Sequence, residues 1–195
     1  MLTTLIELQR LKKLDRTGWT LRGQANGTES VAAHSFGVCA AAMMLADAMI
    51  ARGVQLDVER VLRMALLHDW AETRVGDMPR TATGYFGANV RKEAETAAFA
   101  DIVSNAGAAA SRYLGLYEDY EHRDTLEARV VKAADIIDLL VQVLALERAG
   151  ARGLDEFWDV TDTADFHLDG DAEAVVNEVL KDLLTAREAN HDFAR

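Results

Sequence analysis

The spacing of apolar residues is the feature that most constrains how this chain can fold. Between residues 29 and 52, side chains suited to one buried face recur every three or four positions, at His34, Val38, Ala41 and Leu45. This spacing is typical of an amphipathic helix. Alternating β-branched residues never extend beyond a few positions, so no strand is predicted. The sequence therefore predicts an all-α fold.

A second helix is predicted downstream of this one. Asp57 is a suitable N-cap, and the helix that it opens places His68 and Glu72 on one face. Gly76 and Pro79, the only proline of the chain, are expected to end this region. A third helix is predicted over residues 88–105, where Lys92, Glu93 and Glu95 are expected on an exposed face.

Two more helices are predicted in the second half of the chain. The run Asp124-Thr125-Leu126-Glu127 resembles a capping box, with Glu127 at the third helical position. The helix that follows carries regularly spaced apolar residues and is expected to finish near Gly150. Valines and leucines between residues 175 and 184 predict an amphipathic final helix.

Length and composition indicate a folded globular protein. A chain of 195 residues, half of them hydrophobic, suits a single domain over residues 1–195, with a core over about 1–150 and a helical tail over 151–195. The single Cys39 excludes an internal disulfide and suits the cytoplasm. No uncharged apolar run of membrane-spanning length is expected, so no membrane partner is predicted. The formal charge of −11 argues against long nucleic acid as a partner.

An adjacent histidine and aspartate, His68 and Asp69, follow an apolar helical stretch. A buried carboxylate without a partner costs several kcal/mol, so it needs a cation. His34 and Asp135 occupy similar positions on the apolar faces of their own predicted helices. Two imidazoles and two carboxylates together make a metal site, and this mixture favours Mn, Fe, Co, Ni or Zn over Mg. Either histidine taken alone would more often be a satisfied core residue than a ligand.

Two charged features near these residues bear on the same site. Glu72 lies one helical turn from His68, where it can act near a metal without being a ligand. Its alternative role is an ion pair with Arg74 or Arg80. Residues 10–22 carry five basic side chains against one acidic one, and they are either cations for an anionic substrate or a solvated helix face. Arg16, which precedes Thr17-Gly18-Trp19, is the best candidate for an anion contact.

His34, the pair His68-Asp69 and Asp135 resemble the H…HD…D pattern of the HD-domain metal-dependent phosphohydrolases. The flanking segments narrow the resemblance to the branch that contains the HD-domain 5′-deoxynucleotidases and HD-domain-containing protein 2. These segments are residues 11–19, 29–35 and 67–79. The resemblance runs from the N-terminus to about Leu146 and implies an HD-domain helical bundle. Residues 80–87, which can cover a substrate, depart from it.

The resemblance implies a specific ligand set and reaction. One divalent ion would be held by His34, His68, Asp69 and Asp135, with water on the open positions. The reaction would remove phosphate from a nucleoside 5′-monophosphate, preferring the deoxy form. The implied partners are a small nucleotide and a second copy of the chain, as a homodimer.

The resemblance also implies roles for four other residues. Glu72 would activate or position the attacking water, and Asp77 would assist proton transfer or organise the site. Arg16 would hold the phosphate, and Trp19 would pack against the sugar and test for a 2′-hydroxyl. The alternatives are a turn residue for Asp77 and a core residue for Trp19.

Two other functions stay open at the level of sequence. The first is hydrolysis of a different nucleotide phosphate, such as a nucleoside triphosphate or a signalling nucleotide. The second is a non-catalytic helical module in which a metal is structural. The presence of Glu72 beside all four candidate ligands argues against this second function.

Overall fold

The computed structural model describes residues 1–193, and only the backbone of residues 80, 83, 88 and 191–193. It confirms the all-α prediction. Within this part of the chain there is no strand, and one antiparallel bridge joins Asp15 and Ser30. The chain divides into two compact units, residues 1–36 with 66–118 and residues 37–65 with 119 onward. A single domain over residues 1–195 stays a prediction, and its last two residues lie outside the described part.

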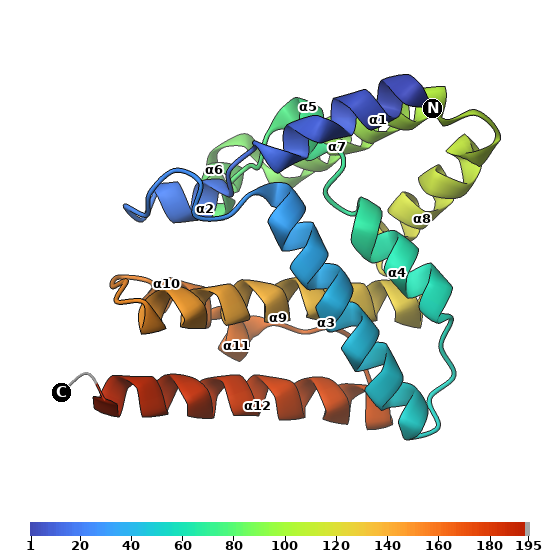
Figure 1. The fold of residues 1–195 in the computed structure, drawn as a ribbon. Coiled ribbons are helices and arrows are strands. Elements are labelled where there is room, and N and C mark those ends of the chain that lie inside the picture. The colour runs from blue at the N-terminus through green and yellow to red at the C-terminus, as the bar shows by residue number, and fades with distance from the viewer. Residues whose placement is uncertain (194–195) are drawn as a thin grey trace. The chain divides into compact units, whose positions relative to one another are not determined.

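The first unit contains short helices around one long helix (Figure 1). Its elements are α1 (Leu2–Leu8), η1 (Gln9–Lys12), α2 (Thr17–Thr20), the start of α3 (Val31–Ala51), α5 (Glu72–Val75), α6 (Arg80–Phe86), α7 (Ala88–Val103), η2 (Ser104–Ala109) and most of α8 (Ala110–His122). Helices α1, α5 and α6 all contact α7. Stacked aromatic rings form part of the core: the centroids of Phe99 and Tyr117 are 4.0 Å apart, and Trp70 stacks on Phe99 at 6.3 Å.

The second unit is built on three long helices. Its elements are most of α3, α4 (Val58–Leu67), α9 (Leu126–Arg148), α10 (Asp155–Trp158), α11 (Val160–Thr163) and α12 (Gly170–Phe193). Helices α9 and α12 lie side by side (Figure 1). Trp158 is 3% exposed and lies in the core of this unit. Its indole Nε1 donates a hydrogen bond to Glu147 Oε1 at 3.3 Å.

Helix α3 is the most apolar of the long helices that the structure describes. By length and composition alone it is apolar enough to span a membrane, although Asp47 interrupts the uncharged run. One face of α3 is fully buried in the protein, with Val38, Ala42, Ala46 and Met49 at 0% exposure. Because these residues recur at spacings of three and four, α3 has the pattern of a core helix.

The predicted helix through His68 and Glu72 is interrupted. Helix α4 ends at Leu67, a turn follows, and α5 begins at Glu72. The Trp70 amide donates to the Leu67 carbonyl and the Glu72 amide donates to the Asp69 carbonyl, both at 3.1 Å. These bonds span three residues rather than four, so a tight turn instead of a regular helix positions His68 and Asp69.

The start of α9 was predicted one residue too early. Thr125 is the N-cap, and its hydroxyl accepts a hydrogen bond from the Ala128 amide at 3.2 Å. Glu127 does not complete a capping box; its Oε1 accepts from the Asp57 amide at 3.0 Å. Asp57 itself caps α4, since its Oδ1 accepts from the Arg60 amide at 3.0 Å, as predicted. Helices α6 and α8 were not predicted.

The buried carboxylate of Asp119 accepts hydrogen bonds from α4 and from the residue that precedes α9, both in the second unit. It accepts hydrogen bonds from the Thr125 amide at 3.0 Å, the Thr125 hydroxyl at 2.6 Å and Arg60 Nη2 at 2.5 Å. Burial acts to raise the pKa of Asp119, but the bonds from Thr125 and Arg60 outweigh it and lower the pKa below 3.8.

We expect Asp119 to contribute to acid sensitivity. A lowered pKa in the folded state stabilises the protein above the unfolded value of 3.8, and this stability is lost as the pH falls through the folded pKa. Asp119→Asn should cost about 1–3 kcal/mol at neutral pH and reduce the loss on acidification. The free energy of unfolding in urea, measured for the wild type and for Asp119→Asn from neutral pH down through the folded pKa of Asp119, tests both effects. Parallel pH curves for the two proteins would contradict this role.

Candidate functional site

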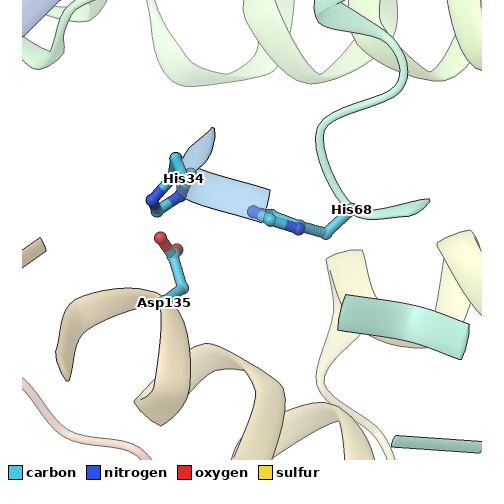
Figure 2. Close-up of side chains that lie close together, drawn as sticks. All are labelled: His34, His68 and Asp135. Carbon is cyan, nitrogen blue, oxygen red and sulfur yellow. The ribbon is translucent and has the colours of Figure 1, made fainter. Parts of the chain in front are cut away.

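Two buried histidines of the first unit face one carboxylate. His34 lies in the first turn of α3 and His68 in the turn after α4 (Figure 2). Each of the two side chains is 1% exposed. Their ring centroids are 5.5 Å apart in an edge-to-face arrangement. Asp69 Oδ2 lies 3.1 Å from His68 Nε2 and 3.6 Å from His34 Nε2. Three atoms able to ligate a metal therefore converge at one point.

The carboxylate of Asp69 is held in its charged form. Burial acts to raise the pKa of Asp69, but the imidazoles of His68 and His34 and the guanidinium of Arg16 outweigh it. The pKa is lowered far below 3.8 as a result. Arg16 Nη1 lies 3.5 Å from Asp69 Oδ2. Two imidazole nitrogens and one ionised carboxylate form a donor set that fits a divalent transition metal ion.

Asp135, the remaining predicted ligand, lies on α9 in the second unit. Its carboxylate is a possible metal ligand, as are the imidazoles of His34 and His68. Lys132 Nζ lies 2.7 Å from Asp135 Oδ2, and the Tyr120 hydroxyl donates to the same oxygen at 3.4 Å. Lys132 precedes Asp135 by three residues, a spacing that predicts contact on a helix.

Glu72 is a buried carboxyl at the start of α5, 9% exposed. Burial and the neighbouring charges of Asp69, Asp77 and Glu95 raise the pKa of Glu72 well above its ordinary value. Within the described part of the chain, its Oε2 accepts no hydrogen bond. The surface ion pair considered with Arg74 is not formed, because Arg74 binds Glu7 at 2.7 Å and Asp101 at 3.0 Å.

Glu95 is a buried acid, although the sequence predicts it on an exposed face. It is 6% exposed on α7, with Arg91 Nε 2.8 Å from its Oε1. Phe99 and Ile102, four and seven residues later, are both fully buried. This i, i+4, i+7 stripe was the signal that could have placed Glu95 on the buried face.

Asp77 organises the segment that carries Arg16. Its Oδ1 lies 3.1 Å from Arg16 Nη1, and its Oδ2 accepts a hydrogen bond from the Thr17 amide at 2.5 Å. The Thr17 hydroxyl donates to the Asp77 backbone carbonyl at 2.7 Å. Arg16 is the N-cap of α2, so these bonds fix both the side chain and the start of that helix.

Trp19 lies in the core of the first unit, as its alternative role predicts. It is 1% exposed, and its indole Nε1 donates to Glu29 Oε2 at 2.6 Å. Residues 80–87 are the segment that departs from the family resemblance, and they include helix α6. In contrast to Trp19, the aromatic residues of this segment are exposed, Tyr85 at 91% and Phe86 at 62%.

An all-α chain with two imidazoles, an ionised aspartate and a guanidinium at one place has the features of a metal-dependent hydrolase for an anionic substrate. A family model described as the HD domain matches residues 8–165. The chain belongs to the HD domain family and is a metal-dependent phosphohydrolase of this family.

The similar proteins support the same assignment. The chain is 32% identical over 159 residues to the 5′-deoxynucleotidase HDDC2 of Xenopus laevis, covering 78% of this chain and 73% of the relative. It is 32% identical over 161 residues to the 5′-deoxynucleotidase hdd1 of Schizosaccharomyces pombe, covering 77% and 75%. A conserved hypothetical protein of Pyrococcus furiosus superposes with a TM-score of 0.83 at 31% identity, covering 95% of this chain and 99% of that one.

Proposed function

We propose that this phosphohydrolase is a 5′-nucleotidase that removes phosphate from deoxynucleoside and nucleoside 5′-monophosphates. The observation that carries the proposal is the convergence of His34, His68 and Asp69 beside the Arg16 guanidinium. A cation site next to a phosphate-binding side chain suits hydrolysis of a phosphate monoester. The names of the relatives from Xenopus laevis and Schizosaccharomyces pombe support a deoxynucleotide substrate.

The proposed ligands of the single divalent ion are His34, His68, Asp69 and Asp135. The order of these residues in the sequence supports the fourth ligand. A contact within the second unit also supports it, because Asp138 on α9 lies against the backbone of α3 at Gly37. Gly37 and Asp138 each follow a proposed ligand by three residues, about one helical turn. The mixed nitrogen and oxygen ligands favour Mn, Fe, Co, Ni or Zn.

Each nearby side chain has a proposed task. An ion held at this site acidifies water and offsets the charge of the phosphoryl group. The Glu72 carboxylate positions the attacking water and takes its proton, which suits a buried carboxyl with a raised pKa. The Arg16 guanidinium binds phosphate oxygens in a fork. Asp77 holds Arg16 and Thr17 in place, so organisation of the site is favoured over proton transfer.

Trp19 is proposed to serve substrate binding mainly by fixing the segment that carries Arg16. Its ring is only 1% exposed, which leaves little surface for a sugar.

Metal analysis and a substrate panel test the proposed function. We expect purified protein to lose phosphate release when chelated and to regain it with Mn, Co or Zn more than with Mg. The panel contains all deoxynucleoside and nucleoside 5′-monophosphates, together with triphosphates. Release of only pyrophosphate or triphosphate would favour the alternative nucleotide hydrolase. A metal-replete protein that hydrolyses no phosphate ester would favour the structural-metal alternative.

We also propose a homodimer that works in the cytoplasm. Family likeness supports the dimer, and α3 exposes several large apolar side chains that a second copy can cover, among them Phe36 at 76% and Met44 at 70%. The free Cys39 suits a reducing compartment. Sedimentation at several protein concentrations measures the oligomeric state, and a monomer at all of them would contradict the dimer.

A further inference from the structure

Glu29 is a buried acid to which the proposed chemistry assigns no role. It is 9% exposed and lies just before α3. Its carboxylate Oε2 accepts a hydrogen bond from Trp19 Nε1 at 2.6 Å, and its backbone carbonyl accepts from the Arg16 amide at 2.9 Å. One residue therefore holds the substrate-binding segment by both its side chain and its main chain.

The hydrogen bonds around Glu29 connect it to the backbone of Arg16. The Trp19 amide donates to the Arg16 carbonyl at 3.2 Å, which closes the single turn of α2. The Val31 amide donates to the Leu14 carbonyl at 2.9 Å and fixes the other side of the same bridge. When Trp19 is anchored, the backbone of Arg16 has little freedom to move.

The position of Arg16 matters because two parallel hydrogen bonds from a guanidinium to a phosphate form only within a narrow range of distances and angles. The guanidinium is directed at Asp69 and Asp77, at 3.5 Å and 3.1 Å, and its side chain is 17% exposed. A misplacement of about 1 Å at such a contact can cost about 100-fold in rate.

We infer that Glu29 is a positioning residue for phosphate binding, acting through Trp19 and Arg16 on the phosphate of a nucleoside monophosphate. This inference rests on the proposed function, in which Arg16 holds the phosphate.

The test measures phosphate affinity in variants of this cluster. Glu29→Ala should raise KM for deoxynucleoside 5′-monophosphates and the inhibition constant of inorganic phosphate by the same factor, about tenfold or more. The metal content should stay unchanged. Glu29→Gln keeps an oxygen that accepts from the indole, so its KM and its inhibition constant for phosphate should lie between those of the wild type and of Glu29→Ala. Trp19→Phe removes the N–H donor but keeps a ring, and it serves if Glu29→Ala does not fold.

Two comparisons separate positioning from a general effect on the fold. In an Arg16→Ala background, Glu29→Gln should cause no further loss of phosphate affinity, because its effect passes through Arg16. Glu147→Ala is the matched control, since Glu147 is 8% exposed and also accepts from an indole, that of Trp158 at 3.3 Å. It should lower the melting temperature without changing the inhibition constant of phosphate.

The phosphate affinities of these variants decide whether Glu29 positions Arg16. Wild-type phosphate affinity in the Glu29 and Trp19 variants, or an equal loss with and without Arg16, would overturn the inference. Calorimetric titration with inorganic phosphate distinguishes this failure from that of the proposed function. If the wild type binds phosphate but hydrolyses no nucleotide, the proposed function fails and the same variants still test Glu29. If the wild type binds no phosphate, the inference is overturned as well.

Discussion

Replacing Glu72 with glutamine is expected to lower kcat by about 10²- to 10⁴-fold, the usual contribution of a general base. The amide cannot accept the proton of the attacking water, although it matches the carboxylate in shape. The folded protein should become more stable, because the substitution removes a buried charge beside Asp69, Asp77 and Glu95. Steady-state kinetics with Mn or Co, together with thermal unfolding, measure both effects.

Glu95→Gln is the matched control for this experiment. It also removes one buried carboxylate of the first unit, but it leaves Glu72 in place. We expect a kcat close to that of the wild type and no gain in melting temperature, because Glu95 is paired with Arg91 Nε at 2.8 Å and the substitution breaks this ion pair. Undiminished turnover of Glu72→Gln, measured with equal metal content, would exclude Glu72 as the base and would favour a structural role for the metal.

Replacing Gly37 with alanine is expected to destabilise the protein by about 1–3 kcal/mol, as overpacking of a tight contact does. A Cβ at this position would lie 2.6 Å from Asp138 Cγ and still closer to Oδ1. Because real Cβ atoms do not approach other atoms so closely, either the Asp138 side chain or the helices α3 and α9 would have to shift within the second unit. The free energy of unfolding in urea measures the cost.

Two further variants show whether the clash is the cause. Gly37→Ala combined with Asp138→Ala should recover most of the lost stability, since the second change removes the atoms that collide. Gly115→Ala on α8 is the control for a helical glycine with open space around it, because nothing lies within 4 Å of its Cβ position. It should be neutral or stabilising by about 0.5–1 kcal/mol. Equal destabilisation at Gly37 and Gly115 would contradict the steric explanation.

Much of the helical framework follows from local pattern. The periodic apolar residues of α3 and α9 predicted both helices to within a few residues, because each long helix buries one regular stripe. The cap at Asp57 was also predicted, since it depends only on a neighbouring amide.

Errors arose where distant contacts override local preference. Glu127 was expected to cap its own helix, but it accepts instead from the amide of Asp57, seventy residues away. The turn at His68 and Asp69 breaks a pattern that looks continuous in the sequence. Local rules cannot detect either case, because the competing partner comes from another part of the fold.

The sequence alone determined the helical class, the HD family and the types of residue that suit a metal and a phosphate. These depend on periodicity and on a short ordered set of histidines and aspartates. Only the tertiary structure decided how Arg16 is held, through Asp77, Trp19 and Glu29, and that Glu95 is buried. The physical reason is that burial and hydrogen bonding arise from residues far apart in the chain, which become neighbours only when the helices pack.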